Sequence, residues 1–515
     1  MHKIIPIIHV LSKLGVLFSV LLLVPTFVSY LFLDDALPAF GRTALVTIIG
    51  SVSVWLLTWH YNRELRQRDG FTLVFMLWVG FAAIAAMPFY LYFPNMSYTD
   101  AFFEAMSGLT TTGASVINSL DTLAPSLNFW RHMLNWLGGM GIIVLAVAIL
   151  PMLGVGGRQL FKAEIPGVDK DSKLAPRISQ VAKKLWMAYL SITVACFLAL
   201  HWAGMSWFDA ICHAMSAVSL GGFSTHDNSI AYFNSVAIEM VIIVATVTGA
   251  INYASHFAAV RNRSLKSYWR DEECRVMLVV LGGSIVAASL YLWQQQYYTS
   301  LSDAFRFVGF NFVSIGLASG FANTDFATWP LLASLWMFFL SNLLASSGSM
   351  GGGIKNVRAL VLFKFSLREV VLLLHPHAVR TVKINKRSIP DRTALTILAF
   401  ISVYFITVVL FTFLMMATGL DFMSAFTAVI ACITNAGPGL GEVGFQFYRV
   451  RDINADDGAV EEYDIAFHFF LQEVDLVAEL FFVQHDLFIG FRIHEAVGTI
   501  RFVQILHRFT FYSSR

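Results

Sequence analysis

Charged side chains are scarce in this sequence. Asp, Glu, Lys and Arg make up 13% of its 515 residues, whereas soluble domains carry about 25%. Hydrophobic residues make up 57%, and the mean hydropathy is +0.67. A soluble core could not bury so much apolar surface, so the sequence predicts a protein whose solvent is lipid. The formal net charge of +2 is too small to indicate a nucleic-acid partner.

Cysteine is also rare, and its spacing excludes several kinds of site. The four cysteines stand far apart with no CxxC pair: Cys196, Cys212, Cys274 and Cys432. We expect neither a disulfide framework nor a zinc site, but small buried hydrophobes. Gly348 and Gly353 have the spacing of a phosphate-binding loop, but Ile354 stands where that motif needs lysine. No nucleophile elbow is present either, and the sequence therefore predicts that the protein is not an enzyme.

Long apolar runs recur along the chain. Each is long enough to cross a hydrocarbon layer of about 30 Å, and the expected spans are 4–33, 43–59, 71–93, 130–155, 183–203, 233–259, 272–293, 330–354 and 393–417. The first run is too long and continuous for a signal peptide, so we expect it to be retained. Four shorter apolar segments lie between the spans: 100–115, 209–224, 303–321 and 424–439. These segments are too short to span, and they predict re-entrant half-helices that protein must shield from lipid.

The distribution of basic residues predicts the orientation of these segments. Lys and Arg gather in four stretches that we assign to the cytoplasmic side: 63–68, 158–184, 261–275 and 355–392. The loops that carry the half-helices hold few basic residues, with Arg306 as the main exception. The positive-inside rule then places every half-helix on the opposite, non-cytoplasmic side. An inverted-repeat transporter would open on both sides, so the pattern favours parallel repeats.

The half-helix segments are copies of one another. Three align without gaps, SYTDAFFEAMSGLTTTGAS (97–115), SWFDAICHAMSAVSLGGFS (206–224) and LDFMSAFTAVIACITNAGPG (420–439), and the segment 302–326 has about four extra residues. Each copy carries a glycine in register: Gly113, Gly222, Gly320 and Gly437. A lone glycine would be read as a helix C-cap. Four glycines in register indicate one repeated structure.

These residue types suit a cage for a dehydrated cation. Backbone carbonyls supply oxygen ligands without a fixed charge that would trap the ion. Turning them to a common axis needs backbone angles that glycine tolerates, and the C-terminal end of each half-helix favours a cation there. Five aspartates on the outer side are candidates to raise the local cation concentration: Asp100, Asp209, Asp227, Asp303 and Asp325. Asp100, Asp209 and Asp303 are equally candidates to cap the half-helices, and the two roles can coexist. Glu104 and Arg306 lie in half-helices, where they are functional candidates or an internal pair that holds these helices together.

Five motifs occur in the order and spacing of a known family. They are TTTGAS (110–115), NWLGGMGIIVLAVAILP (135–151), GGFSTHDNSI (221–230), SGSMGGGIK (347–355) and NAGPGLGEVG (435–444). Over about residues 1–444 the sequence resembles the TrkH/KtrB superfamily of bacterial potassium transport proteins. It is closest to the TrkH branch, which has two extra N-terminal helices.

The resemblance implies an all-α polytopic protein with four parallel pseudo-repeats of helix, re-entrant pore helix with filter loop, and helix. It implies potassium uptake across the bacterial inner membrane, a homodimer, and a cytoplasmic nucleotide-binding partner ring of the TrkA type. The filter positions that it implies, mostly through main-chain carbonyls, are Thr111, Thr112, Leu220, Gly221, Ala318, Ser319, Asn435 and Ala436, with Gly113, Gly222, Gly320 and Gly437 closing each turn. It also implies a gating loop at 345–353, with Ser346, Ser347, Gly348, Ser349, Gly351, Gly352 and Gly353 as its polar and flexible residues.

The resulting division of the chain has six parts. They are two N-terminal helices (1–69), pore repeat 1 (70–170), repeat 2 (171–262), repeat 3 with the gating loop (263–390), an incomplete repeat 4 (391–443) and an atypical tail (444–515).

The third filter reads LASG (317–320), where the TrkH branch more often has a threonine-rich stretch. In the tail, Glu479, His485 and Asp486 interrupt the best apolar stretch, and an acid at a helix centre costs about 2.5–3.5 kcal/mol.

Two other functions remain open at the level of the sequence. One is a cation symporter coupled to sodium or protons that uses the same cage, which should offer titratable groups near the membrane midplane. The other is a membrane scaffold that conducts nothing, which does not account for four glycines in register.

Overall fold

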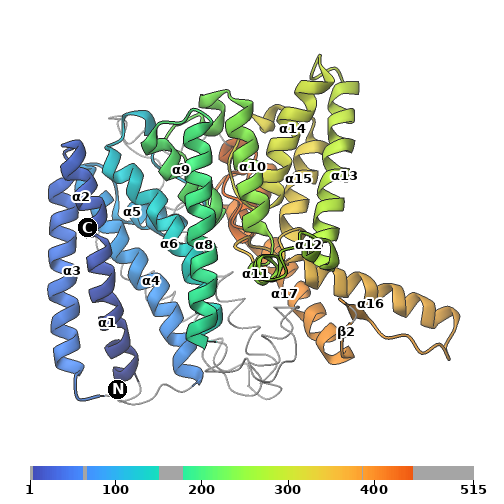
Figure 1. Ribbon diagram of the computed structural model, residues 1–515, viewed down its shortest axis with the longest axis horizontal. Coiled ribbons are helices and arrows are strands. Elements are labelled where there is room, and N and C mark those ends of the chain that lie inside the picture. Colours follow the sequence, from blue (N-terminus) through green and yellow to red (C-terminus); the bar gives the residue numbers. More distant parts are fainter. Residues whose placement is uncertain (1–3, 62–66, 150–177, 386, 445–515) are drawn as a thin grey trace.

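The computed structural model describes residues 4–61, 67–149, 178–385 and 387–444 (Figure 1). The expected boundary between repeats 1 and 2 at residue 170 lies outside the described residues. So do the tail from residue 445 onward, most of the basic stretch 63–68, and the basic stretch 158–184 up to residue 177.

The chain is a multi-pass helical membrane protein, as expected. Six of its described helices are long and apolar enough to cross a membrane, and a seventh span results if one bent helix pair is counted. Within the described residues the only β structure is a short antiparallel pair, β1 (Lys383–Ile384) with β2 (Arg387–Ser388). Apolar side chains on the outer faces, such as Val46 and Leu57, are 70% and 80% exposed. Such a surface is compatible with lipid and not with water.

The first two spans stand at one edge of the molecule. α1 (Ile5–Leu21) and α2 (Leu23–Phe32) together form one apolar stretch of 28 residues, and α3 (Leu37–Thr58) returns beside α1 (Figure 1). The expected second span began at residue 43, but the helix begins at Leu37 because Pro38 can occupy its first turn.

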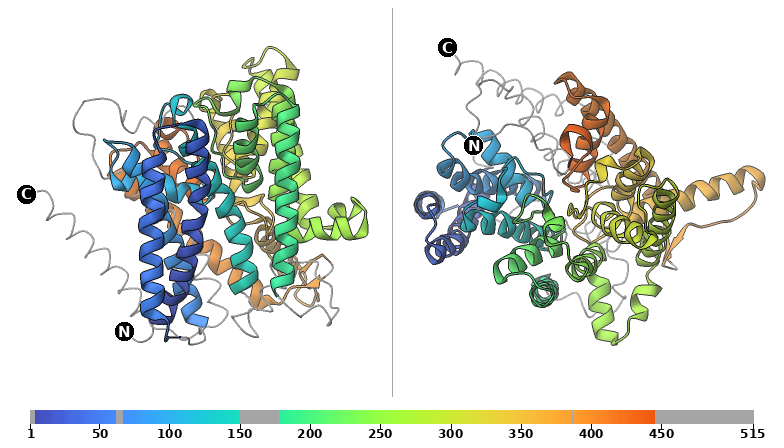
Figure 2. Two further views of the ribbon diagram at one scale, coloured as in Figure 1. Left: turned by 60° about the vertical axis from the view of Figure 1, so that its left-hand side comes forward. Right: turned by 90° about the horizontal axis from the view of Figure 1, so that it is seen from above.

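The rest of the chain repeats one arrangement four times. A short helix follows a long one in each repeat: α5 (Tyr98–Leu109) after α4 (Gln67–Tyr92), α9 (Trp207–Ser219) after α8 (Ile178–Trp202), α14 (Leu301–Gly316) after α13 (Glu272–Gln294), and α18 (Phe422–Ile433) after α17 (Asp391–Ala417). In three repeats a third helix follows: α6 (Pro125–Ile149), α10 (Val236–Ala250) and α15 (Leu331–Leu343). Each third helix also packs on the short helix of the next repeat. From above, the repeats follow one another around a common centre (Figure 2).

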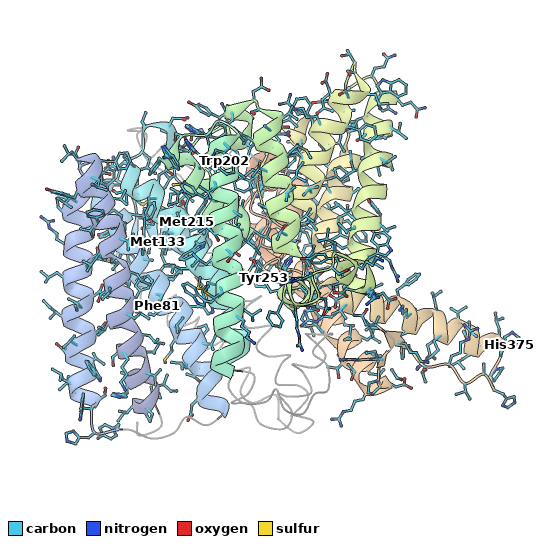
Figure 3. The ribbon with its side chains drawn as sticks, viewed as in Figure 1. Phe81, Met133, Trp202, Met215, Tyr253 and His375 are labelled. Carbon is cyan, nitrogen blue, oxygen red and sulfur yellow. The ribbon has the colours of Figure 1, made fainter. Side chains whose placement is uncertain are left out.

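The connecting segments that the structure describes contain further short elements. They hold the 3₁₀ turns η1 (Leu120–Thr122), η2 (Ser229–Phe233), η3 (Phe326–Thr328) and η4 (Gly441–Val443), and the helices α11 (Tyr253–Asn262) and α12 (Lys266–Arg270). Methionines fill the space between neighbouring repeats: Met133 of α6 and Met215 of α9 belong to one buried cluster (Figure 3). Trp130 is fully buried in the same cluster and donates a hydrogen bond to the Ala85 carbonyl at 3.1 Å.

The caps of the half-helices differ from the expectation. The side chains that accept from the first-turn amides are Ser97, Ser206, Ser300 and Asp421. Asp100 and Asp209 stand three residues after a cap serine, and each carboxylate accepts a hydrogen bond from the hydroxyl of that serine, at 2.8 and 2.7 Å. In α5 the Asp100 carboxylate also accepts from the Ser97 amide at 3.3 Å, which completes a capping box.

The four extra residues of the third copy form one more helical turn. α14 has 16 residues, whereas α5 and α18 have 12 and α9 has 13. An α-helix has 3.6 residues per turn, so the insertion lengthens α14 at its start and leaves the register at its end unchanged.

Two expected spans are not continuous helices. The stretch 233–259 breaks into α10 and α11, which meet at 99°, because Asn252 leaves the helical conformation and caps α11. The stretch 330–354 holds only α15, after which residues 344–355 form an irregular loop and α16 (Asn356–Leu374) begins. The glycine-rich segment 345–353 therefore lies between two helices and not inside one. α16 projects from the body of the molecule, with His375 at its tip (Figures 1 and 3).

Gly138 of α6 should be intolerant of a side chain. A Cβ atom there would lie 1.8 Å from the Leu109 carbonyl oxygen at the end of α5. We expect Gly138→Ala to lower the melting temperature of the purified protein, at a cost of about 1–3 kcal/mol for overpacking. Gly282→Ala is the control, since no atom lies within 4 Å of its added Cβ and alanine favours a helix. Equal melting temperatures for the two variants would contradict this packing.

Candidate selectivity filter

All four half-helices end in the same hydrogen-bond pattern. The amide that begins each outgoing strand donates to the carbonyl five residues earlier: Thr112 to Ser107 at 2.9 Å, Gly221 to Ser216 at 2.8 Å, Ser319 to Ser314 at 2.7 Å, and Ala436 to Ala431 at 2.8 Å. The preceding amide donates to the carbonyl three residues earlier in every copy. This pair of bonds is the Schellman motif of a helix C-terminus.

The left-handed residue of this motif is not glycine. It is Thr111 (φ 60°), Leu220 (59°), Ala318 (60°) or Asn435 (56°). Left-handed backbone at a residue other than glycine costs on the order of 1–3 kcal/mol. The four glycines stand two residues later and form a second left-handed position, with φ between 73° and 86°. The reading of each glycine as an ordinary helix C-cap is therefore wrong.

The four filter glycines close a ring. A Cβ on Gly113 would lie 2.0 Å from the Gly221 carbonyl oxygen, and one on Gly222 would lie 2.5 Å from that of Ser319. A Cβ on Gly320 would lie 2.9 Å from the Ala436 oxygen, and one on Gly437 would lie 2.6 Å from that of Thr112. The contacts run from repeat 1 to 2, 2 to 3, 3 to 4 and 4 back to 1, so only glycine fits at each junction.

The ring brings together all twelve filter positions expected from the sequence. Thr111, Thr112, Leu220, Gly221, Gly113, Gly222, Ala318, Ser319, Gly320, Asn435, Ala436 and Gly437 belong to the four strands that meet there. None of their side chains carries a formal charge. One carbonyl from each strand lies against the filter glycine of the repeat before it in the ring. Carbonyl oxygens are the groups that replace the water shell of an alkali cation. The aligned half-helices end at this ring and add a negative potential.

The segment 345–353 lies directly against the ends of the half-helices. A Cβ on Gly352 would be 2.4 Å from the Thr434 carbonyl oxygen, and one on Gly351 would be 3.2 Å from that of Leu317. The Ser346 amide also donates to the Ala250 carbonyl, at the end of α10, at 3.1 Å. The structure therefore places the expected gating loop beside repeats 2, 3 and 4 at the level where their helices end.

Two ionisable side chains hold this loop, and sequence reasoning missed both. The Glu273 carboxylate is completely buried in α13 and accepts hydrogen bonds from the Ser347 amide and hydroxyl, each at 2.9 Å. Lys355 donates its ammonium group to the carbonyls of Ser349, at 3.4 Å, and Gly351. An acid inside an expected membrane span was the signal that could have identified Glu273.

Glu104 and Arg306 do not pair with each other, contrary to one expectation. Arg131 of α6 contacts Glu104 with 2.6 Å between Nε and Oε1, and both side chains are at most 1% exposed. Arg306 contacts Glu239 of α10 at 2.7 Å. Each pair therefore links a half-helix to a neighbouring helix, and the basic or acidic partner of each was missed because it lies in an expected span.

An ionic contact also joins the outer loops of repeats 1 and 2. His226 hydrogen-bonds Asp121 through Nδ1, and its Nε2 lies 3.5 Å from a carboxylate oxygen of Asp209. Burial alone would lower the pKa of His226, but the nearby carboxylates of Asp209 and Asp121 outweigh burial and raise that pKa above its ordinary value. Burial opposes the ionised form of Asp121 too, but the hydrogen bond from His226 lowers the pKa of Asp121.

A model of the TrkH family, described as a cation transport protein, matches residues 36–454 of this chain. The chain is 44% identical over 449 residues to the Trk system potassium uptake protein TrkH of Vibrio parahaemolyticus, which covers 87% of this chain and 93% of that protein. It is 42% identical to TrkH of Escherichia coli, with the same shares covered.

The fold is similar to a solved structure as well. The crystal structure of the potassium transporter TrkH from Vibrio parahaemolyticus superposes with a TM-score of 0.82 at 37% identity, over 95% of this chain and 99% of the other.

The contact of His226 with Asp121 and Asp209 makes the stability of the fold depend on pH. A group whose pKa is raised by folding stabilises the protein fully below its unfolded pKa, and that contribution is lost as the pH rises through the folded pKa. We therefore expect the melting temperature to fall as the pH rises from about 6 through the raised pKa of His226, and His226→Gln to flatten this fall. His375→Gln, at the tip of α16, is the control. An unchanged pH profile in His226→Gln would contradict the contact.

Proposed function

Because the chain belongs to the TrkH family of cation transport proteins, we propose that it takes up potassium ions through the ring of four filter strands. The observation that carries this proposal is the closed circuit of glycine-to-carbonyl contacts between the strands. A ring of uncharged oxygens binds a dehydrated cation without trapping it. Potassium is the cargo of this ring and not a resident cofactor.

We assign the binding oxygens to the main chain of the filter strands. The ring carbonyls belong to Thr112, Gly221, Ser319 and Ala436, and the left-handed residues before them, Thr111, Leu220, Ala318 and Asn435, complete the set. The side chain of Thr112 also donates to the Asn435 side chain at 3.2 Å, which ties strands 1 and 4 together. The third filter lacks the threonine-rich sequence that is more common in the TrkH branch. The assignment does not depend on this difference, because the oxygens come from the backbone.

The loop at 345–353 is the gate in this proposal. It lies against the ends of the half-helices α14 and α18 and of α10. It has no regular secondary structure, and three backbone bonds join it to the end of α10 and the start of α11: Ser346 to Ala250, Tyr253 to Gly348 at 3.3 Å, and Met350 to Gly249 at 3.5 Å. A segment held by few bonds can move without unfolding the helices around it. Its movement would open or close the path on the inner side of the filter.

The remaining parts of the proposal rest on the family. We place the chain in the bacterial inner membrane, as a homodimer that a cytoplasmic TrkA-type ring regulates, and we keep the division into four repeats at 70–170, 171–262, 263–390 and 391–443. The projecting helix α16 supports the partner assignment, because Phe363, Leu367 and Leu373 on it are 63%, 50% and 82% exposed. The proposed activity is transport, in line with the names of the relatives, and not catalysis.

Gly113→Ser should erode ion discrimination. Serine would combine a left-handed backbone at φ 79° with a Cβ only 2.0 Å from the Gly221 oxygen, so the carbonyl ring must open. We expect rubidium flux into proteoliposomes to fall and the ratio of rubidium to sodium flux to drop by about tenfold, which corresponds to about 1.4 kcal/mol.

A matched control separates the clash from the backbone strain. Gly204 also has a positive φ, of 111°, but nothing lies within 4 Å of its added Cβ. Gly204→Ser should keep the wild-type flux ratio. Wild-type discrimination in Gly113→Ser would overturn the filter assignment, and flux that requires a sodium or proton gradient would favour the symporter.

Ser347→Ala tests the gate. It removes the hydroxyl that donates to the buried Glu273 carboxylate and leaves the Ser347 amide bond in place. Removing one hydrogen-bond partner of a buried polar group costs about 1–3 kcal/mol, so the loop should leave its observed position more often and the rubidium flux of the purified chain should rise. Ser349→Ala is the control, because that hydroxyl donates only within the loop, to Ser346. Equal flux in both variants would contradict a gate held by Glu273.

A further inference from the structure

A polar side chain recurs on the pore helices behind the filter. It stands nine residues before the filter glycine in three repeats, as Glu104, His213 and Asn311, and ten residues before it in the fourth, as Thr427. All four side chains have 0% exposure. Their chemistry differs completely, and therefore the sequence alignment of the repeats gives no sign that they are equivalent.

In repeat 1 the side chain holds the strand that leaves the filter. Glu104 accepts hydrogen bonds from the Val116 amide and the Ser115 hydroxyl, each at 3.0 Å. Arg131 completes the network, since it donates to Glu104 at 2.6 Å and to Ser115 at 2.9 Å. It also reaches the Ser224 carbonyl of the next repeat at 3.2 Å. The Glu104 carboxylate is thus hydrogen-bonded to the residues that follow Gly113.

In repeat 2 a histidine holds the outgoing strand. The Nδ1 atom of His213 is 2.8 Å from the Asp209 carbonyl, which can only accept, so this nitrogen carries the proton. Nε2 is then the acceptor in the neutral ring, and the Ser224 hydroxyl donates to it at 2.9 Å. Ser224 follows Gly222 at the same distance as Ser115 follows Gly113.

Repeats 3 and 4 use an amide and a hydroxyl. The Asn311 amide group donates to the Asn323 side chain at 2.6 Å and to the Phe307 carbonyl at 2.8 Å. The Thr427 hydroxyl accepts from the Leu440 amide at 2.9 Å and donates to the Met423 carbonyl at 2.8 Å. In repeats 2, 3 and 4 the bond to the preceding helical turn fixes the rotamer, and the second bond reaches the strand beyond the filter.

We propose that Glu104, His213, Asn311 and Thr427 are four positioning residues that hold the outgoing filter strands and thereby set the carbonyl ring on which ion discrimination depends. Each strand is held before the filter glycine by the hydrogen bond of its Schellman amide. It is held after the filter glycine by a hydrogen bond to one of these four side chains. The glycine between the two hydrogen bonds has no side chain of its own to resist displacement. The inference rests on the proposed function for its ion readout but not for its structural readout.

Thr427 offers the cleanest test, because valine has its shape without the hydroxyl. Thr427→Val leaves the Leu440 amide without its acceptor, and Thr427→Ser restores it. Thr412→Val is the matched control, since Thr412 is also buried and donates one turn back, to Val408 at 2.8 Å, but does not touch the filter. Asn311→Leu repeats the test in repeat 3 if Thr427→Val does not give folded protein.

The first readout is amide hydrogen exchange in peptides that span 436–444, measured on purified full-length chain. We expect exchange at least fivefold faster in Thr427→Val, as the loss of one hydrogen bond implies, and wild-type exchange in Thr427→Ser and Thr412→Val. Exchange that is unchanged in Thr427→Val would overturn the inference, whether or not the chain transports ions.

The second readout is the ratio of rubidium to sodium flux in proteoliposomes. We expect it to fall roughly fivefold in Thr427→Val and to be restored in Thr427→Ser. A flux ratio that stays at the wild-type value while exchange rises would also overturn the inference, since the strand would then be loosened without effect on discrimination. An unmodified chain that shows no preference for rubidium would instead refute the proposed function, and the exchange measurement would still decide whether Thr427 positions the strand.

Discussion

The close approach of four carbonyl oxygens to four glycine Cα atoms is the constraint on which the rest of the structure depends. None of the four positions has room for a methyl group, since the added Cβ would lie 2.0–2.9 Å from the neighbouring oxygen. The half-helices must therefore end at one level and in one orientation. The neighbouring helices α6 and α10 and the loop 345–353 must also come close, and Gly138, Gly249 and Gly352 permit this at the ends of α5, α9 and α18.

The ring is costly to build, and the structure offsets the cost locally. Each strand places one residue other than glycine in the left-handed region, at on the order of 1–3 kcal/mol, and Thr111 is β-branched, which makes this conformation harder. Every strand begins with two Schellman bonds, and buried polar side chains hold the strand beyond the glycine. Because these bonds lie in a low-dielectric interior, an unmade one would cost more than it would in water.

The sequence was informative where the requirement is local and repeated. The four glycines in register predicted the ring, and the half-helix lengths followed from apolar runs that are too short to span. It was less informative about contacts between distant segments. Nothing at the sequence level pairs Glu104 with Arg131 or Glu239 with Arg306, because the partners lie in different helices. Hydropathy alone also extended the span 330–354 too far, since Ser and Gly interrupt a run whose hydropathy still suits a helix, and only the family resemblance indicated a loop at 345–353.

The differences between the repeats are compatible with a fourfold ring that has the single gate we propose. In repeats 1 and 2 a helix, α6 or α10, passes the end of the half-helix with a glycine against its carbonyl. In repeat 3 the equivalent chain is unwound after α15, and its glycines lie against the ends of α14 and α18 instead. Repeat 3 thus contacts the ends of half-helices closely with a loop, where repeats 1 and 2 use a helix. In four identical subunits an unwound segment would recur four times around the axis. Four covalently linked, diverged repeats allow the connection in repeat 3 to differ from the helices α6 and α10 that pack on the half-helix ends of repeats 1 and 2.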